Sequence, residues 1–296
     1  MSESTPVLRL VWPQWQGASP QSVAPLTAPM PYAAAQRGYS LGSRILELVA
    51  PVGGADTVVV PVSSEQGDLT VTDGIYARSI VLDQLREALR LLDERNPERV
   101  VTLGGECSVS VAPFAHLARR YGDDLAVVWV DAHPDTGMPE ASYDGYHAMA
   151  VSVLLGHGDA EFVEALPATV DASRVALTGL HAWDDDQEPY FREWGLATFA
   201  PDDLRTDSEP LLTWLRGTGC SKVAVHFDVD TIDGNEVVLG LGADPGGLSS
   251  TQVVRVINDV AGAADLVGLT IAEYVPRQVI TLVELLKQLP LLGDTH

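Results

Sequence analysis

Short apolar runs alternate along this chain with segments in which apolar and charged positions recur at helical spacing. The apolar runs predict strands at residues 8–12, 57–62, 99–103, 125–130, 175–178, 222–227 and 266–271. The segments between them predict helices at residues 43–49, 77–94, 108–121, 151–155, 161–166, 209–216, 250–261 and 280–289. Residues 13–39 and 69–73 follow neither pattern and are expected to be irregular. Apolar strands that alternate with helices are typical of a parallel sheet covered on both faces.

The chain is long enough for a complete hydrophobic core. It has 296 residues, of which 46% are hydrophobic but only 6% aromatic, so Val, Leu, Ile and Ala must fill most of that core. An α/β fold of roughly 200–300 residues often forms one domain. The sequence contains no internal repeat or low-complexity linker, so we expect a single domain over residues 1–296.

The charge balance narrows the choice of partner. With 18 basic and 41 acidic residues, the formal net charge is -23. Such a surface repels nucleic acid and anionic membranes, and it favours metal ions or small cationic molecules. The same excess of acid also fits a solubility adaptation, so the charge by itself does not identify a substrate.

Several features favour a soluble, cytoplasmic protein. The first residues lack a basic region followed by an apolar run, and no apolar stretch approaches the ~20 residues that cross a bilayer. The cysteines are Cys107 and Cys220. We expect free thiols in a reducing compartment rather than a disulfide.

Polar side chains gather where four predicted strands end. The motifs that follow these strands are Asp131-Ala132-His133-Pro134-Asp135, Asp228-Val229-Asp230, Gly104-Gly105-Glu106-Cys107-Ser108 and the single residue Glu273. Ligands of parallel α/β sheets bind at the carboxyl ends of the strands. These motifs are therefore expected to form one site.

The acidic residues of these motifs predict a metal site. Residues two apart in an extended chain point to the same side, so Asp228 and Asp230 can face one ligand, as can Asp131, His133 and Asp135. Carboxylates held this close repel one another unless a cation neutralises them. Four carboxylates with one imidazole suit Mn²⁺ better than an ion that prefers sulfur. A lone Asp-x-Asp is usually a solvated loop, but both motifs at strand ends favour metal binding.

At these positions the chain resembles the arginase, agmatinase and formimidoylglutamase family. The family motif D-A-H-x-D matches residues 131–135, and S-x-D-x-D-x-x-D-P is similar to residues 226–234 with its first and last positions changed. The motif G-G-D-H-S is similar to residues 104–108 with two changes. Residues 273–276 and 245–248 resemble the late E-x-N-P and P-G-G-L elements. The matches keep the family order across most of the chain.

The resemblance implies a three-layer α/β/α fold with a central parallel sheet and one or two bound Mn²⁺ ions. By this resemblance Asp131 and Asp228 bridge the two ions. Asp135 and Cys107 complete one site, and His133 and Asp230 complete the other. Members of the family commonly form trimers or hexamers, so a homo-oligomer is also expected.

The family also implies a chemistry. A metal-activated hydroxide attacks the guanidinium carbon, and Glu273 holds the guanidinium by charge-assisted hydrogen bonds. Asp135 can pass a proton to the leaving amine. His147 stands where the family has a histidine that shuttles protons, although its plain alternative is a surface-loop histidine.

One departure from the family concerns the metal. Cys107 replaces a metal-binding histidine: its thiolate would shift preference toward Zn²⁺, Fe²⁺ or Co²⁺, or the side chain is passive and one ion binds. His226 lies on the strand face of Asp228, so it either partly compensates or is a buried core histidine. Cys220 is expected to be structural.

The other departures concern the substrate. The loop 136–146 lacks the Asn of the arginase loop and is acidic, which argues against arginine. Glu140 and Asp144 could attract a second cationic group, as in agmatine, or they are solvated. We therefore expect a metal-dependent amidinohydrolase acting on a small cationic guanidino compound. The alternatives are a non-catalytic relative that serves as a binding or regulatory partner, and a formimino hydrolase.

Overall fold

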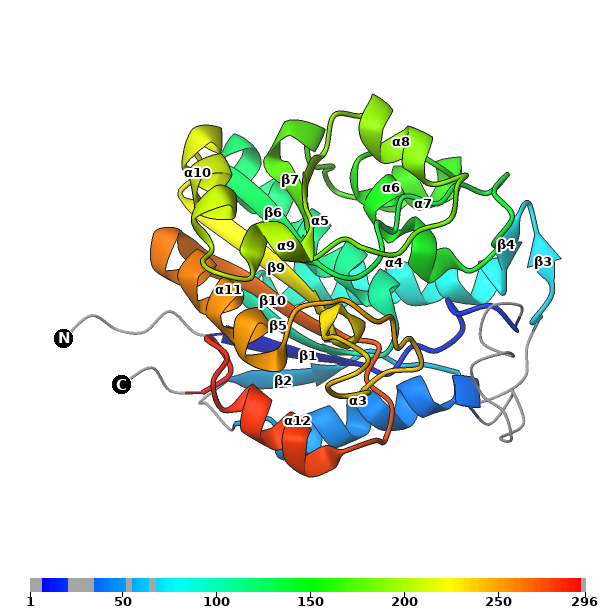
Figure 1. The fold of residues 1–296 in the computed structure, drawn as a ribbon. Coiled ribbons are helices and arrows are strands. Elements are labelled where there is room, and N and C mark those ends of the chain that lie inside the picture. Colours follow the sequence, from blue (N-terminus) through cyan, green and yellow to red (C-terminus); the bar gives the residue numbers. More distant parts are fainter. Residues whose placement is uncertain (1–6, 21–34, 52–54, 64–67, 294–296) are drawn as a thin grey trace.

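A single parallel sheet forms the centre of the molecule (Figure 1). The computed structural model describes residues 7–20, 35–51, 55–63 and 68–293. Eight strands lie in the order β2-β1-β5-β10-β9-β6-β7-β8, and every neighbouring pair is parallel. The strands are β1 (Val7–Trp12), β2 (Asp56–Val59), β5 (Arg99–Gly104), β6 (Leu125–Val130), β7 (Val175–Thr178), β8 (Ala197–Phe199), β9 (Lys222–Asp228) and β10 (Asp265–Ala272).

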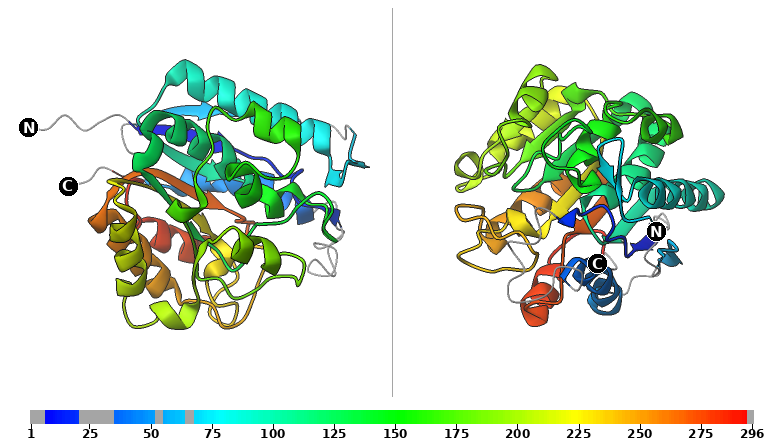
Figure 2. Two further views of the ribbon diagram at one scale, coloured as in Figure 1. Left: turned by 90° about the horizontal axis from the view of Figure 1, so that it is seen from above. Right: turned by 90° about the vertical axis from the view of Figure 1, so that its right-hand side faces the viewer.

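Helices cover both faces of this sheet. One face carries α4 (Arg78–Arg95), α5 (Val111–Tyr121), α6 (Ala150–Leu154) and α7 (Ala160–Ala165). The other face carries α3 (Gly38–Val49), α10 (Glu209–Thr218), α11 (Ser250–Ala263) and α12 (Val279–Leu286). Seen from above, the sheet lies between α4 on one side and α10 with α11 on the other (Figure 2). The predicted three-layer α/β/α fold is confirmed.

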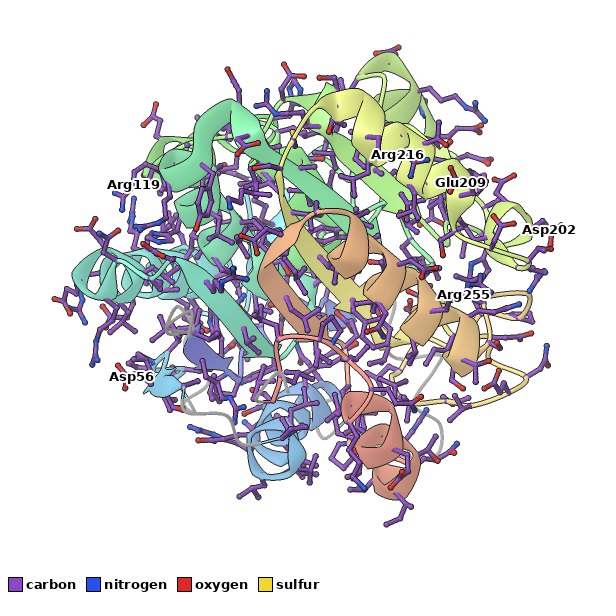
Figure 3. The ribbon with its side chains drawn as sticks, turned by 90° about the vertical axis from the view of Figure 1, so that its left-hand side faces the viewer. Asp56, Arg119, Asp202, Glu209, Arg216 and Arg255 are labelled. Carbon is purple, nitrogen blue, oxygen red and sulfur yellow. The ribbon has the colours of Figure 1, made fainter. Side chains whose placement is uncertain are left out.

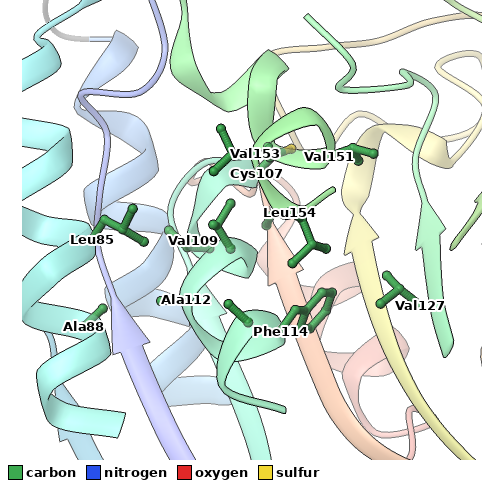
Figure 4. Packing of buried hydrophobic residues seen from close by; sticks show 14 of the residues in the cluster. Leu85, Ala88, Cys107, Val109, Ala112, Phe114, Val127, Val151, Val153 and Leu154 are labelled. Atoms are coloured by element: carbon green, nitrogen blue, oxygen red, sulfur yellow. The ribbon is translucent and has the colours of Figure 1, made fainter. Parts of the chain in front are cut away.

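Alternation along each strand divides the core into two layers. In β6, Val127 and Trp129 pack against α4 to α7, whereas Ala126 and Val128 pack against the opposite helices. Both sets are fully buried, so the strand reads as a continuous apolar run. Cys107 belongs to the layer on the side of α4 to α7. It lies at the end of that layer where the strand arrowheads point (Figure 4).

Most predicted elements occur within a few residues of their expected bounds, and the first difference concerns a loop. Residues 69–73, expected to be irregular, contribute to a hairpin of β3 (Val71–Thr72) and β4 (Ile75–Tyr76). Its turn is Asp73-Gly74, with φ of 49° and 77°. Positive φ at both central residues of a two-residue loop is typical of a hairpin turn, and Asp-Gly is a favoured pair for it. The turn residues, rather than hydrophobic periodicity, contained the signal.

Three short elements near the sheet edge were not predicted: α8 (Glu188–Glu193), β8 and α9 (Pro201–Leu204). The strand β8 is short and none of its side chains is fully buried, so it has no apolar run to detect. The predicted strand at 57–62 ends earlier, because β2 stops at Val59. Part of the segment 13–39 lies outside the described residues, and α3 begins at Gly38 within it.

Charged side chains occupy the outside of the molecule. Figure 3 shows Arg119 and Asp56 at the periphery, and it shows Glu209 beside Arg216 on α10, where the two form an ion pair. Within the described part of the chain, no helix has both the length and the apolar character that crossing a bilayer requires.

The four strands in the middle of the sheet bring the polar motifs together. The strands β5, β10, β9 and β6 are consecutive neighbours, and each ends at the first residue of one of the motifs or directly before it. After β5 the chain passes close to the loop that follows β1, where a Cβ on Gly105 would lie 1.7 Å from the carbonyl oxygen of Gln14. Only glycine fits there.

Candidate metal centre and its cavity

Side chains that can ligate a metal converge at the carboxyl ends of these strands in three overlapping groups. The groups are Cys107 with Asp131, His226 and Asp228; Asp131 with His133 and Asp230; and Cys107 with His147 and Glu273. Within each group the donor atoms lie within 4.8 Å of one another. All but one of the residues that the sequence predicted for the site are therefore in these groups.

His133 joins the carboxylates of the second group. Its Nδ1 lies 3.3 Å from Oδ2 of Asp230 and 3.5 Å from Oδ1 of Asp131. On the other side of the ring, Nε2 lies 3.5 Å from Oδ2 of Asp244. Burial opposes the charged imidazolium, but the carboxylates of Asp230 and Asp131 outweigh it and raise the pKa of His133 well above its usual value.

Cys107 is a buried member of the first group. Its Sγ lies 3.0 Å from Oδ2 of Asp228 and 3.9 Å from Oδ2 of Asp131. Burial, with the nearby carboxylates led by Asp228, raises the pKa of the Cys107 thiol well above its usual value. Without a cation nearby, the thiol therefore keeps its proton.

The carboxylates of Asp131 and Asp228 each accept a hydrogen bond from the backbone N–H two residues further along the chain. Oδ1 of Asp131 accepts from the backbone N–H of His133 at 2.7 Å, and Oδ1 of Asp228 accepts from that of Asp230 at 2.8 Å. Burial and the charges of Asp230 and Asp131 raise the pKa of Asp228 well above its usual value. These turns hold the other carboxylate oxygens toward the shared centre.

His147, which is partly buried, and the buried Glu273 form a pair in the cavity wall. Nδ1 of His147 lies 2.9 Å from Oε1 of Glu273, and its Nε2 lies 2.6 Å from the Tyr143 hydroxyl. Burial lowers the pKa of His147, but the charge and hydrogen bond of Glu273 outweigh it and raise the pKa to about 9. The same pairing lowers the pKa of Glu273, against the opposing effect of burial.

Asp135 is the predicted site residue that lies outside all three groups of described residues. It is buried with a φ of 49°, and its Oδ2 has no hydrogen-bond partner. It lines the same cavity as the metal-ligating groups. Burial, followed by repulsion from Asp131, raises its pKa well above the usual value.

Apart from Asp131 and His226, which lie behind its wall, these residues line one cavity of about 590 Å³. Sequence reasoning missed several of the side chains in its wall, which are Tyr39, His181, Trp183, Asp184, Gln187 and Asp244. Four of them follow β7, so the rule that ligands bind at strand ends could have found them. Glu140 and Asp144, which we considered for a second cationic group, are not among the lining residues. Of the described residues that line the cavity, none is Lys or Arg.

The donor atoms present fit a divalent cation. Buried polar atoms in proteins are nearly always paired, yet Oδ2 of Asp135 and Nε2 of His226 are buried without hydrogen-bond partners. Burial raises the pKa of Asp230 as well, so Asp135, Asp228 and Asp230 resist carrying their negative charges together, whereas His133, against the effect of burial, lowers the pKa of Asp131. A cation would satisfy the unpaired atoms and offset this repulsion.

Fold and site together define an α/β/α protein with groups able to hold metal ions in an acidic cavity. A sequence model of the arginase family matches residues 49–282. The chain therefore belongs to the arginase family.

The relatives are distant. An arginase of Staphylococcus aureus strain MSSA476 is 26% identical over 206 residues, which are 67% of this chain and 68% of that protein. An arginase of strain COL is 27% identical over 139 residues, and there the alignment spans about half of each chain, 45% and 46%. The solved structure of arginase from Bacillus caldovelox aligns with a TM-score of 0.79 at 18% identity, covering 98% of this chain and 99% of that one. This structural likeness concerns the fold.

Proposed function

We propose that this protein is a metal-dependent amidinohydrolase that cleaves a C–N bond of a small cationic guanidino compound other than arginine. One observation carries the proposal: most members of the metal-ligating groups and the His147–Glu273 pair line the same cavity, whose described wall contains no Lys or Arg. We assign the activity to one catalytic domain over residues 1–296 and expect a homo-oligomer, a trimer or hexamer, by analogy with the family.

Cys107, Asp131, His133, Asp135, Asp228 and Asp230 would hold one or two divalent ions, Mn²⁺ being the family's usual metal. When bound, the metal supplies a Lewis acid that makes a water molecule nucleophilic near neutral pH. Backbone N–H groups fix one carboxylate oxygen each of Asp131 and Asp228, which leaves the second oxygen of each available to such an ion.

We assign Glu273 to the binding of the guanidinium group. It is only 5% exposed, and its Oε1 accepts from the backbone N–H of Cys107 at 3.1 Å as well as from His147. A planar guanidinium can donate two hydrogen bonds to a carboxylate, which fixes its plane. Glu273 would thereby present the guanidinium carbon to the metal-ligating groups.

We assign to His147 the transfer of a proton to the leaving amine. Its raised pKa means that the imidazolium form persists at neutral pH. Tyr143 and Glu273 hold the two ring nitrogens, so the ring is oriented before substrate arrives. Asp135, buried in the same wall, is the alternative proton carrier.

The outer wall indicates which substrates fit. Asp184 and Asp244 line the cavity, and Trp183 beside them is 40% exposed. Carboxylates attract a distal ammonium, and an exposed indole face can bind one through a cation–π contact. A carboxylate on the substrate would be repelled by the same residues. We therefore expect a diamine-like guanidino compound to be preferred over an amino acid.

A substrate screen tests this assignment. Purified protein loaded separately with Mn²⁺, Zn²⁺, Fe²⁺ or Co²⁺ is incubated with agmatine, shorter and longer guanidino amines, arginine and formiminoglutamate. We expect urea from a cationic guanidino amine at a higher kcat/KM than from arginine, and none from Glu273→Gln. Formamide from formiminoglutamate would support the formimino alternative. Full metal loading without turnover of any compound would support the non-catalytic alternative.

A further inference from the structure

His226 is a fully buried histidine whose two ring nitrogens have different surroundings. Nδ1 lies 2.7 Å from the hydroxyl oxygen of Ser110, whereas Nε2 has no hydrogen-bond partner. The nearest carboxylate oxygen, Oδ2 of Asp131, is 3.7 Å from Nε2, which is too long for a hydrogen bond. A histidine retained only to fill the core would be expected to pair both nitrogens.

The sheet directs this unpaired nitrogen at the metal-ligating groups. His226 is opposite Trp129 in the β6–β9 register, and the two rings stack with centroids 3.7 Å apart and planes 12° from parallel. Asp228 and Asp131 come two residues after His226 and Trp129 in their strands, so all four side chains lie on one face of the sheet. Trp129 also donates from Nε1 to Oδ2 of Asp131 at 3.1 Å.

Cys107 approaches the same carboxylates, Asp131 and Asp228, from another element. It begins the short 3₁₀ segment after β5, Cys107–Ser110, which also provides the hydroxyl that holds His226. Cys107 Sγ, His226 Nε2 and carboxylate oxygens of Asp131 and Asp228 all lie within 4.8 Å of one another. One segment thus supplies a sulfur donor and also orients a nitrogen donor.

The two strongest donor groups differ in chemical character. Asp131, His133 and Asp230 offer two oxygens and one nitrogen, which suits Mn²⁺. The group that contains Cys107 and His226 also offers two oxygens and one nitrogen but adds a thiolate sulfur, and soft or borderline ions prefer such a donor. Asp131 belongs to both groups, so it can connect two unlike metal positions.

We propose that His226 and Cys107 ligate one metal ion together with Asp131 and Asp228, and that this position selects Zn²⁺ or a similar borderline ion over Mn²⁺. His226, supplied from β9, takes the place of the imidazole that the motif after β5 lacks. The Cys107 thiol loses its proton to solvent when the ion binds. Ser110 is a positioning residue that holds Nδ1 so that Nε2 faces the ion. The inference rests on the metal dependence of the proposed function.

A cobalt titration tests the sulfur ligand directly. Metal-free protein is titrated with one equivalent of Co²⁺ and its near-ultraviolet absorption is recorded, because a thiolate bound to Co²⁺ produces a charge-transfer band. We expect the band in the unaltered protein and in Cys220→Ser, the matched control at the other cysteine. Cys107→Ser should abolish it. A band that is absent from the unaltered protein, or that survives Cys107→Ser, would overturn the assignment.

A competition experiment tests His226. Zn²⁺ and Mn²⁺ affinities are measured against a chromophoric chelator for the unaltered protein, His226→Asn and the exposed control His157→Asn. We expect His226→Asn to weaken Zn²⁺ binding by about 10- to 100-fold or more and Mn²⁺ binding much less. Ser110→Ala should show the same selectivity change with a smaller magnitude, and His157→Asn should show none. Equal loss of both metals in His226→Asn would contradict the selectivity.

Because His226 is buried, its variant could fail to fold, so the unaltered protein provides an independent measurement. X-ray absorption of the full chain with one equivalent of Zn²⁺ should show one sulfur and one imidazole in the ligand shell. A shell of oxygen and nitrogen alone would overturn the proposal. None of these readouts needs turnover. Sulfur ligation without any hydrolysis would contradict only the proposed function, and hydrolysis without sulfur ligation would contradict only this inference.

Discussion

At the scale of single residues, His147 offers the most direct test of the proposed function, in which it carries a proton. It contacts Glu273 through one ring nitrogen and Tyr143 through the other. A side chain that transfers a proton in the transition state typically contributes 10²–10⁴-fold to the rate. His147→Asn keeps a polar group of similar size but cannot carry the proton.

We therefore expect His147→Asn to lower kcat by about 10²- to 10⁴-fold and to change KM only a few-fold. Tyr143→Phe, which removes one partner of the ring, should lower kcat by a smaller factor. Steady-state kinetics with the preferred guanidino amine measure both, and His157→Asn provides a histidine control outside the cavity. An unchanged kcat in His147→Asn would exclude it as the proton carrier.

The sequence predicted which side chains converge better than it predicted how each one is held. The carboxylates and His133 follow apolar strands directly, so position and type together predicted that they converge. Asp135 was expected to ligate metal, but its left-handed backbone and unpaired Oδ2 could not be read from spacing. The unpaired Nε2 of His226 depends on Ser110, which is 116 residues away in the chain. No local pattern contains such a contact.

At the scale of elements, the turn after β5 determines how closely two strand ends can approach. The backbone N–H of Gly105 donates to the carbonyl of Trp12 at 2.9 Å, and its carbonyl accepts from the N–H of Glu273 at 2.7 Å. Gly217 in α10 is a matched glycine whose added Cβ would meet nothing within 4 Å. The two positions predict opposite effects of the same substitution.

Gly105→Ala should lower the free energy of unfolding by about 2–3 kcal/mol, because its Cβ would lie 1.7 Å from a backbone oxygen that must move. Gly217→Ala should instead raise the free energy of unfolding by about 0.5–1 kcal/mol, because alanine favours the helix. Urea denaturation of the two variants measures both. Equal stability of Gly105→Ala and the unaltered protein would show that the turn can open, and Gly105 would then not fix the approach of the two strand ends.

The opposite end of the sheet contains a partly exposed ion-pair network. Asp265 at the start of β10 binds Arg99 at 2.7 Å and Lys222 at 2.8 Å. Burial alone would raise the pKa of Asp265, but Lys222 and Arg99 outweigh it and lower the pKa below its usual value. A lowered carboxyl pKa stabilises the folded state above the unfolded pKa, and the contribution is lost as the pH falls through the folded value.

Asp265→Asn should therefore cost about 0.5–1 kcal/mol of unfolding free energy at pH 7, since exposed pairs are screened by solvent. The difference from the unaltered protein should shrink as the pH falls below about 4. Urea denaturation across this range measures it, with the exposed Asp185→Asn as control. A difference that persists unchanged at acid pH would point to packing rather than charge.

The predictability of the elements follows their burial. Strands buried on both faces, such as β6, β9 and β10, have apolar runs that hydrophobic pattern detects. The hairpin β3–β4 was missed because its signal lies in turn residues, and β8 was missed because it is a short, incompletely buried edge strand. The elements that the sequence did not predict are therefore those that lack a local hydrophobic periodicity and depend on turn residues or tertiary contacts.

At the scale of the whole molecule, charge repulsion should limit the stability of the metal-free protein. The formal net charge is -23, and several carboxylates meet at one buried centre. Salt screens the distributed surface charge, since the Debye length falls from about 30 Å at 0.01 M to about 8 Å at 0.15 M. A bound divalent ion instead neutralises the carboxylates at the buried centre, and its effect can be measured at constant ionic strength.

These two effects can be separated by thermal unfolding. Raising NaCl from about 0.01 to 0.15 M should raise Tm of the metal-free protein and of Asp131→Asn alike, because surface repulsion is common to both. Zn²⁺ or Mn²⁺ at about 100 times its dissociation constant should add about 2.7 kcal/mol, or several degrees of Tm, at constant ionic strength. Asp131→Asn, which removes the carboxylate shared by two donor groups, should lose most of this second increase. If Asp131→Asn responded to metal as strongly as the unaltered protein, the stabilising ion would bind elsewhere, and the strand-end groups would not be the metal centre.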